Sequence, residues 1–246
     1  MKRTYRRYRS AMQCAVLIAG FLIVPPDSGS VPVQCVTPED PCLGGNRHPG
    51  TSAFTAIAPT CSPIIIDLAG TGFKLTSAQN GVQFDISGTG KPIQIAWTDG
   101  DTRNAFLVLD RDGNGRIDNG KEMFGNFTPQ PPSAHPNGFL ALAEFDKTVN
   151  GGNGDGIIDA RDAIFGSLRL WADANHDGIS QPNELHKLAD AGVFSISLNY
   201  KEARRMDQFG NQFRYRGKIN VTDQAEDNSS ANQIAYDVFL TTGSVK

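Results

Sequence analysis

Between residues 63 and 110 the chain has short runs of strand-type residues, some of them alternating with polar positions, that are separated by Gly, Asn and Asp. A period of two places successive side chains on opposite faces of a strand, and the separating residues are typical of turns. The pattern predicts short strands at 63–67, 72–76, 82–85, 93–97 and 105–110. It returns later in the chain and predicts further strands at 168–171, 193–199, 212–221 and 234–240.

Three segments between these regions have a helical period or helix-end signals instead. Hydrophobic residues recur at helical spacing in 138–145, and Asp159 is a candidate cap for a helix over 160–168. A third helix is predicted over 182–191, because Pro182 suits a first turn and Gly192 follows the end. In the short strand between two of these helices, we expect Trp171 to pack in the core.

Residues 173–184 fit the EF-hand loop pattern D-x-[DN]-x-[DN]-G-x5-E at every constrained position. In such a loop, short side chains at alternate places converge on one point, and a carboxylate at the twelfth place binds the ion with two oxygens. Gly178 at the sixth place permits the sharp turn. The expected calcium ligands are Asp173, Asn175, Asp177, the backbone carbonyl of Ile179, and Glu184.

A second loop begins at Asp110 and matches the pattern through its ninth place. Its expected ligands are Asp110, Asp112, Asn114, the carbonyl of Arg116, and Asp118. Lys121 stands at the twelfth place, where the closing carboxylate is expected, and Glu122 comes one residue later. Either the loop is one residue longer and Glu122 turns inward, or Asp118 closes the site directly or through a water. We favour Glu122.

The loop between these two lacks its first ligand. It supplies Asn153, Asp155, the carbonyl of Ile157, Asp159 and Asp162, but Gly151 stands at the first place. Asp146 precedes this loop, and the glycine-containing insertion between them would let the chain fold back and deliver its carboxylate.

Each motif has a simpler interpretation, because Asp-Gly and Asn-Gly are common in plain turns with solvated carboxylates. Three such loops within one short region favour metal binding, and their flexible oxygen-rich ligand sets favour Ca²⁺ over Mg²⁺. Turns at Asp67 and Asp85 resemble the loops, but Ala, Ser or Thr replaces their middle carboxylates, so we expect turns and not sites.

These patterns together indicate an α+β fold in which short antiparallel strands alternate with EF-hand-like calcium loops and short helices. Five basic residues, a hydrophobic run over 15–24 and small residues at 28–30 have the form of a secretory signal. We therefore expect a signal peptide at 1–30, a Pro- and Gly-rich linker or leader at 31–61, and a calcium-binding domain at 62–246.

The whole chain has a formal net charge of −3, and the first 30 residues carry five basic residues and one acid, so the remainder has a charge of −7. This balance argues against a nucleic-acid partner. The hydrophobic run is too short for stable membrane insertion, which favours a secreted, extracellular or periplasmic protein. Of the cysteines after the signal, Cys35, Cys42 and Cys61, one pair would close in an oxidising compartment, with Cys35 and Cys42 as the short-loop option.

The order of motifs over residues 63–200 resembles the calcium-binding module of large secreted RTX-type proteins, including their self-processing modules. The segments that carry this resemblance are 106–125, 138–142, 153–159 and 170–185. The resemblance implies a domain that folds on binding calcium and, in the self-processing members, cuts an Asp-Pro bond at its own amino terminus. Here Ser62-Pro63 occupies that place, and Ala69 and Thr71 replace acids of the turn that follows. We therefore expect calcium binding without self-cleavage.

The resulting hypothesis is a secreted, non-enzymatic calcium-binding module with a structural or interaction role, whose partners are calcium ions and an unidentified extracellular protein. Two alternatives remain open. One is a dockerin-like interaction module, since 154–168 and the loop at Asp173 resemble paired dockerin loops. The other is a self-processing module that has lost its cleavage site.

Overall fold

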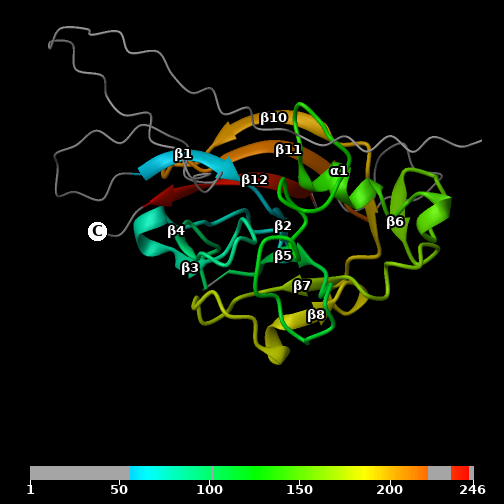
Figure 1. Ribbon diagram of the computed structural model, residues 1–246, viewed down its shortest axis with the longest axis horizontal. Coiled ribbons are helices and arrows are strands. Elements are labelled where there is room, and N and C mark those ends of the chain that lie inside the picture. Colours follow the sequence, from blue (N-terminus) through cyan, green and yellow to red (C-terminus); the bar gives the residue numbers. More distant parts are fainter. Residues whose placement is uncertain (1–55, 101, 221–233, 244–246) are drawn as a thin grey trace, which may run out of the picture. The chain divides into compact units, whose positions relative to one another are not determined.

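Strand β12 (Ile234–Gly243) is the longest strand of a ten-stranded antiparallel sheet in the computed structural model (Figure 1), which describes residues 56–100, 102–220 and 234–243. On one side β12 pairs with β11, followed by β10, and on the other side β2, β5, β7 and β8 follow in order. The last residues of β12 also pair with β1 and β4, and β4 pairs with β3. The remaining strands of this sheet are β1 (Ala56–Cys61), β2 (Ile64–Asp67), β3 (Val82–Phe84), β4 (Ile93–Ile95), β5 (Asn104–Val108), β7 (Arg169–Trp171), β8 (Leu185–Lys187), β10 (Lys201–Met206) and β11 (Gln212–Lys218).

Both faces of the central strands are buried, because neighbouring residues of one strand enter different cores. Ile65 and Phe106 belong to a cluster with Trp97 and Trp171, whereas Ile64 and its neighbours on β5 pack with Phe139 and other residues of a second cluster. Alternation of side chains across a strand explains this division. The continuous hydrophobic runs of β2 and β5 therefore mark the centre of the fold.

The expectation of an α+β fold is wrong. The described chain is mainly antiparallel β, with one short α-helix, α1 (Gly138–Ala143), and single 3₁₀ turns at Ala78–Asn80, Thr148–Asn150, Pro182–Glu184 and Ala189–Ala191. A separate two-stranded sheet pairs β6 (Ile157–Asp159) with β9 (Ser195–Ser197). The loops thus follow the EF-hand pattern without the helices that flank EF-hand loops.

Two of the three predicted helices do not form, and tertiary contacts explain why. Residues 160–168 make turns, because Asp162 bends back to accept backbone N–H groups from the preceding loop. The predicted helix over 182–191 stops after one 3₁₀ turn, because Leu185 leaves it to pair with Trp171 as β8. Segment 72–76 was predicted as a strand but contributes only an isolated bridge at Leu75.

Some expectations concern residues outside the described ranges, including the signal peptide at 1–30, most of the linker at 31–61, Cys35 and Cys42. Strand β1 begins at Ala56, before the expected start of the domain. Cys61 at its end is buried and disulfide-bonded. Within the described residues, no helix has the length and hydrophobicity that crossing a membrane requires.

Candidate metal-binding loops

The first loop follows β5, and its backbone wraps around the carboxylate of Asp110. One oxygen of Asp110 accepts the N–H groups of Gly113 at 2.8 Å and Asn114 at 3.2 Å, and the other accepts that of Gly115 at 2.8 Å. Both glycines have positive φ angles, which glycine adopts without the steric cost that other residues meet. The glycines of the motif therefore place the first carboxylate in the centre of the turn.

Glu122 turns into this loop from the far end. Its side chain is only 3% exposed, and it accepts the N–H of Arg111 at 3.1 Å and that of Asp118 at 2.9 Å. Oxygen atoms of Asp110, Asp112 and Glu122 all lie within 4.8 Å of one another. This geometry corresponds to the longer register, with Glu122 in the closing position. Burial raises the pKa of Glu122, the two backbone N–H groups lower it, and the nearby acids Asp118 and Asp112 raise it.

The last loop repeats this arrangement and joins it to the core. Asp173, 3% exposed, accepts the N–H of Asp177 at 3.2 Å on one oxygen and that of Gly178 at 2.9 Å on the other. The second oxygen also accepts the indole N–H of Trp97 at 2.8 Å. A buried tryptophan needs a partner for its N–H, so the core and the loop satisfy each other.

The closing carboxylate of the last loop has a matching set of donors. Glu184 accepts the N–H of Ala174 at 3.0 Å and that of Gln181 at 3.2 Å, and the indole N–H of Trp171 lies 3.3 Å from one of its oxygens. The two tryptophans of the chain therefore both contact carboxylates of this loop. Sequence patterns gave no sign of these contacts, because they join positions far apart in the chain.

In the middle loop the first place is filled by Asp146. The chain folds back so that Asp146 accepts the N–H of Gly154 at 2.9 Å on one oxygen and that of Gly156 at 2.9 Å on the other. Gly152 makes the close approach possible, because a Cβ there would lie 2.2 Å from backbone atoms of Asp146. The insertion thus brings a carboxylate to the place that Gly151 leaves without one.

The other end of the middle loop differs from its counterparts. Asp162 closes it by accepting the N–H of Asn153 at 3.2 Å and that of Asp159 at 2.8 Å. However, the guanidinium of Arg161 lies 2.7 Å from Asp155 and 2.6 Å from Asp159. The hydrogen bond from Arg161 lowers the pKa of Asp159, and this side chain competes with any cation for the same oxygens.

All three loops share one backbone frame. In each, the side chain at the fifth place accepts the N–H of the residue at the seventh place; the pairs are Asn114 with Arg116, Asp155 with Ile157, and Asp177 with Ile179. In each, an asparagine amide donates to a neighbouring ligand carboxylate; these donors are Asn114, Asn153 and Asn175. Because amide nitrogen and oxygen exchange by a simple flip, the same asparagines can present oxygen to a cation.

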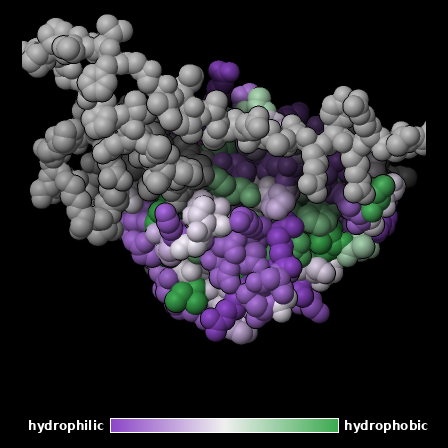
Figure 2. Space-filling model, viewed as in Figure 1, coloured by the Kyte–Doolittle hydropathy of each residue, from purple (hydrophilic) through white to green (hydrophobic). Residues whose placement is uncertain are grey.

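The donor set suits a hard cation, since every candidate ligand is a carboxylate, amide or backbone oxygen. Among the described residues, the first loop alone brings three acidic side chains within 4.8 Å of one another. In Figure 1 the green loops that follow β5 in the chain lie in front of β5 and β7 in this view. Figure 2, seen from the same side, shows a broad hydrophilic area over this part of the surface.

The turns at Asp67 and Asp85 use the same opening as the loops. Both oxygens of Asp67 accept backbone N–H groups, including that of Gly72 at 2.6 Å, and both oxygens of Asp85 do likewise, including that of Gly90 at 2.6 Å. Neither turn has further carboxylates at its middle places. The opening turn is therefore a structural unit that exists with and without a set of ligands.

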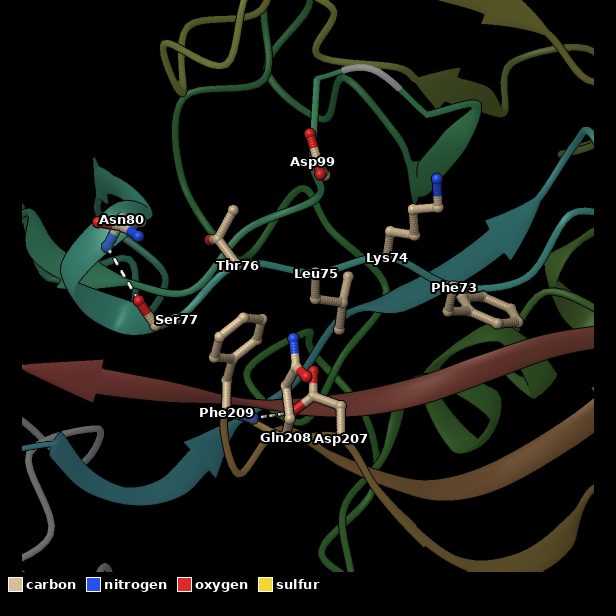
Figure 3. Close-up of a pocket in the computed structure, with 10 residues that line it drawn as sticks. All are labelled: Phe73, Lys74, Leu75, Thr76, Ser77, Asn80, Asp99, Asp207, Gln208 and Phe209. Atoms are coloured by element: carbon tan, nitrogen blue, oxygen red, sulfur yellow. Dashed lines mark hydrogen bonds between the residues drawn. The ribbon is translucent and has the colours of Figure 1, made fainter.

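Two other features lie apart from the candidate ligands. An open pocket of about 510 Å³ lies between residues 73–77, Asp99 and the turn at 207–209 (Figure 3), but it contains none of the candidate ligands. His176, the fourth residue of the last loop, contacts the carbonyl oxygens of Thr98 at 2.7 Å and Asn80 at 2.9 Å.

Asp237 is a buried acid of β12, outside every loop, and its side chain contacts the first residue of α1. One of its oxygens accepts the N–H of Gly138. Within the described residues, no hydrogen bond of normal geometry reaches the other oxygen. The Ser62 hydroxyl nevertheless favours the charged form of the carboxyl group. Burial dominates and raises the pKa of Asp237 to about 6, against the lowering effects of Ser62, Gly138 and Arg214.

Comparison with known proteins gives two findings. Residues 64–236 match the SPM domain family, and this range includes all three loops. The chain is also similar to the iron-regulated protein FrpA of Neisseria meningitidis serogroup C, with 40% identity over 164 residues. The matched region covers 65% of this chain but 14% of that relative. The matched region is thus a small part of that relative, which is much longer than this chain.

Proposed function

We propose, on the premise that the chain belongs to the SPM domain family, that it is a non-enzymatic calcium-binding module of an exported protein of the RTX type. The observation that carries the proposal is the frame shared by the three loops. Each loop holds an opening and a closing carboxylate with backbone N–H groups and directs further oxygen ligands to the same region.

Calcium is the cation that these loops fit best. Ca²⁺ accepts six to eight oxygen ligands in flexible geometry, whereas Mg²⁺ requires a tight octahedron and retains several waters. The loops offer carboxylates, amides and backbone oxygens on a turn-rich backbone, which matches the ligand preference of Ca²⁺. The candidate ligands are those given by the loop pattern, with Glu122 closing the first loop and Asp146 opening the middle one.

Bound calcium would stabilise the folded domain. A site whose free calcium is about 100-fold above its dissociation constant adds about 2.7 kcal/mol to the free energy of unfolding. Domain stabilities are about 5 to 15 kcal/mol in total, so two filled sites contribute a large share. Without ions, the neighbouring carboxylates repel one another, and this repulsion lowers the stability of the folded domain.

Calorimetric titration of the chain with calcium and with magnesium tests the proposal. We expect tight calcium binding, much weaker magnesium binding, and the loss of one site in Asp112→Ala, whose side chain is exposed and hydrogen-bonds only to Asn114 of the same loop among the described residues. The matched control is Asp67→Asn, which changes an acid at the same kind of turn outside the loops and should leave the number of sites unchanged. Absence of calcium binding to the wild-type chain would refute the proposal.

We also propose that this chain does not cut itself. Ser62 precedes Pro63, so the bond lacks the neighbouring carboxylate that the resemblance associates with cleavage, and Ser62 is bound to Asn126 through its N–H at 2.8 Å. Incubation with calcium followed by mass analysis should show no fragment that begins at Pro63, or at Pro41, which follows Asp40 in the sequence. Ser62→Asp is the variant that probes residual competence, and a calcium-dependent fragment from the wild-type chain would contradict this expectation.

A further inference from the structure

The first and last loops touch at equivalent places. Ile117 is the eighth residue of the first loop and Ser180 the eighth residue of the last loop. The N–H of Ile117 donates to the Ser180 hydroxyl at 2.7 Å, and the same hydroxyl donates to the carbonyl oxygen of Ile117 at 3.3 Å. A hydroxyl can donate and accept together, so Ser180 closes a two-way link between the loops.

This link is buried, and therefore costly to break. Ile117 is 1% exposed and Ser180 is 4% exposed. A buried backbone N–H that loses its partner carries the full cost of its lost hydration. Ile117 also belongs to the core cluster that contains Trp97 and Trp171, whose indole N–H groups contact the last loop. Both a polar link and a packed core thus join the two loops.

The link lies next to the candidate ligands of both loops. In the first loop Ile117 lies between Arg116, whose carbonyl is a candidate ligand, and Asp118, whose N–H holds the closing carboxylate. In the last loop Ser180 lies between Ile179 and Gln181, which have the same two roles. Because each linked residue is flanked by groups that form its own site, ordering of one loop by an ion restricts the backbone of the other.

The middle loop provides an internal comparison. Its eighth residue, Ile158, pairs with Ile196 of β9 in the separate two-stranded sheet, and not with another loop. Its calcium site therefore has no equivalent contact with a second site. Any coupling through eighth-place residues is confined to the first and last loops.

We propose that Ser180 is a positioning residue that couples the first and last loops, so that calcium in one loop raises the calcium affinity of the other. This inference rests on the proposed calcium-binding function. Coupling energies between linked sites correspond to affinity changes of about 5- to 150-fold. We expect a change near the lower end of that range, because a single hydroxyl carries the polar link.

The test uses tryptophan fluorescence, since both tryptophans contact carboxylates of the last loop and so report its occupancy. Calcium titrations are made on the wild-type chain, Asp112→Ala, Ser180→Ala and the double variant. With Ser180 present, Asp112→Ala should weaken calcium binding to the last loop about fivefold. With Ala at position 180, the same substitution should change that affinity less than twofold. The coupling is overturned if Asp112→Ala has the same effect in both backgrounds or none in either.

Two controls separate coupling from damage to the fold. Asp155→Ala, in the middle loop, should leave the affinity of the last loop unchanged, and Ser180→Thr, which keeps the hydroxyl, should retain the fivefold effect of Asp112→Ala.

If Ser180→Ala does not fold, Ser180→Cys replaces it in the cycle, because a thiol is a weak hydrogen-bonding group of similar size. Loss of the fivefold effect in Ser180→Thr would overturn the proposal. Wild-type chain that binds no calcium in calorimetry would refute the proposed function itself, and this outcome is distinct from binding without coupling.

Discussion

The last loop and the middle loop hold their acids with equivalent backbone N–H groups, but their surroundings are opposite in character. In the last loop, Trp97 and Trp171 donate from the core to the opening and closing carboxylates. In the middle loop, the guanidinium of Arg161 lies against Asp155 and Asp159 at the surface. One loop is thus ordered by neutral donors from the core, and the other is neutralised by a charged side chain of its own.

The surroundings of the acids therefore affect how well a loop can bind an ion, in addition to the motif itself. Neutral donors position a carboxylate and leave its charge available to an ion, whereas an arginine occupies the same oxygens with a competing charge. We therefore rank the last loop above the first loop, and the first loop above the middle loop, in calcium affinity. The close approach of three acids in the first loop makes it the nearest rival of the last.

The largest expected effect is that of Asp173→Ala. In calcium, this substitution removes the contribution of a filled site, about 2.7 kcal/mol, and leaves the buried Trp97 N–H without its partner, at about 1–3 kcal/mol. The free energy of unfolding should fall by about 4–6 kcal/mol, as measured by denaturant unfolding in calcium.

The matched substitution in the middle loop is Asp155→Ala, which should cost less than 1 kcal/mol because Asp155 is exposed and already paired with Arg161. Asp110→Ala should lie between the two. A larger loss from Asp155→Ala than from Asp173→Ala would reverse the ranking, and equal stability of the wild-type chain with calcium and with chelator would mean that the loops are only turns.

Asp237 shows the effect of burial on an acid that lies outside the candidate metal-binding loops. Its pKa is raised to about 6 in the folded state from an ordinary value of 3.8, so the folded chain binds the proton more tightly than the unfolded chain. Its contribution is fully present below about pH 4 and is lost as the pH rises through 6, which amounts to about 3 kcal/mol.

Unfolding free energies of the wild-type chain and Asp237→Asn in chelator, between pH 4 and 7, measure this contribution. The wild-type chain should lose about 3 kcal/mol relative to the variant over that interval. Parallel pH profiles for the two proteins would show that Asp237 titrates normally in the folded state.

Arg161→Gln has the smallest expected effect and tests the middle loop directly. An exposed ion pair of this kind is worth about 0.2–1 kcal/mol, so its removal should raise the calcium affinity of the middle loop about two- to fivefold. Arg116→Gln is the control, because the side chain of Arg116 is exposed and forms no salt bridge within the described residues. Calorimetry resolves the weakest site, and unchanged affinity in Arg161→Gln would show that the arginine does not compete.

Local patterns were sufficient for much of the fold. The hydrophobic runs in 63–67 and 105–110 predicted β2 and β5, and the spacing of acids and glycines placed turns where Asp110 and Asp173 form them. Strand β10 was missed because its residues Lys201–Met206 are almost all polar or exposed and show no hydrophobic alternation. The helix predicted over 160–168 does not form, because these residues belong to the end of the middle loop. There the Asp162 carboxylate accepts the N–H groups of Asn153 and Asp159.

The acids, amides and glycines of each loop could be recognised in the sequence, because a tight turn around a carboxylate is built from neighbouring residues and needs only local backbone freedom. The packed fold was needed to show that Trp97 and Trp171 hold the last loop, that Ser180 joins it to Ile117, and that Glu122 and not Asp118 closes the first loop. The tryptophan and serine contacts link residues distant in the chain, and the closure depends on a buried side chain. Such contacts follow from how strands pack into a common core, which no local spacing of residues specifies.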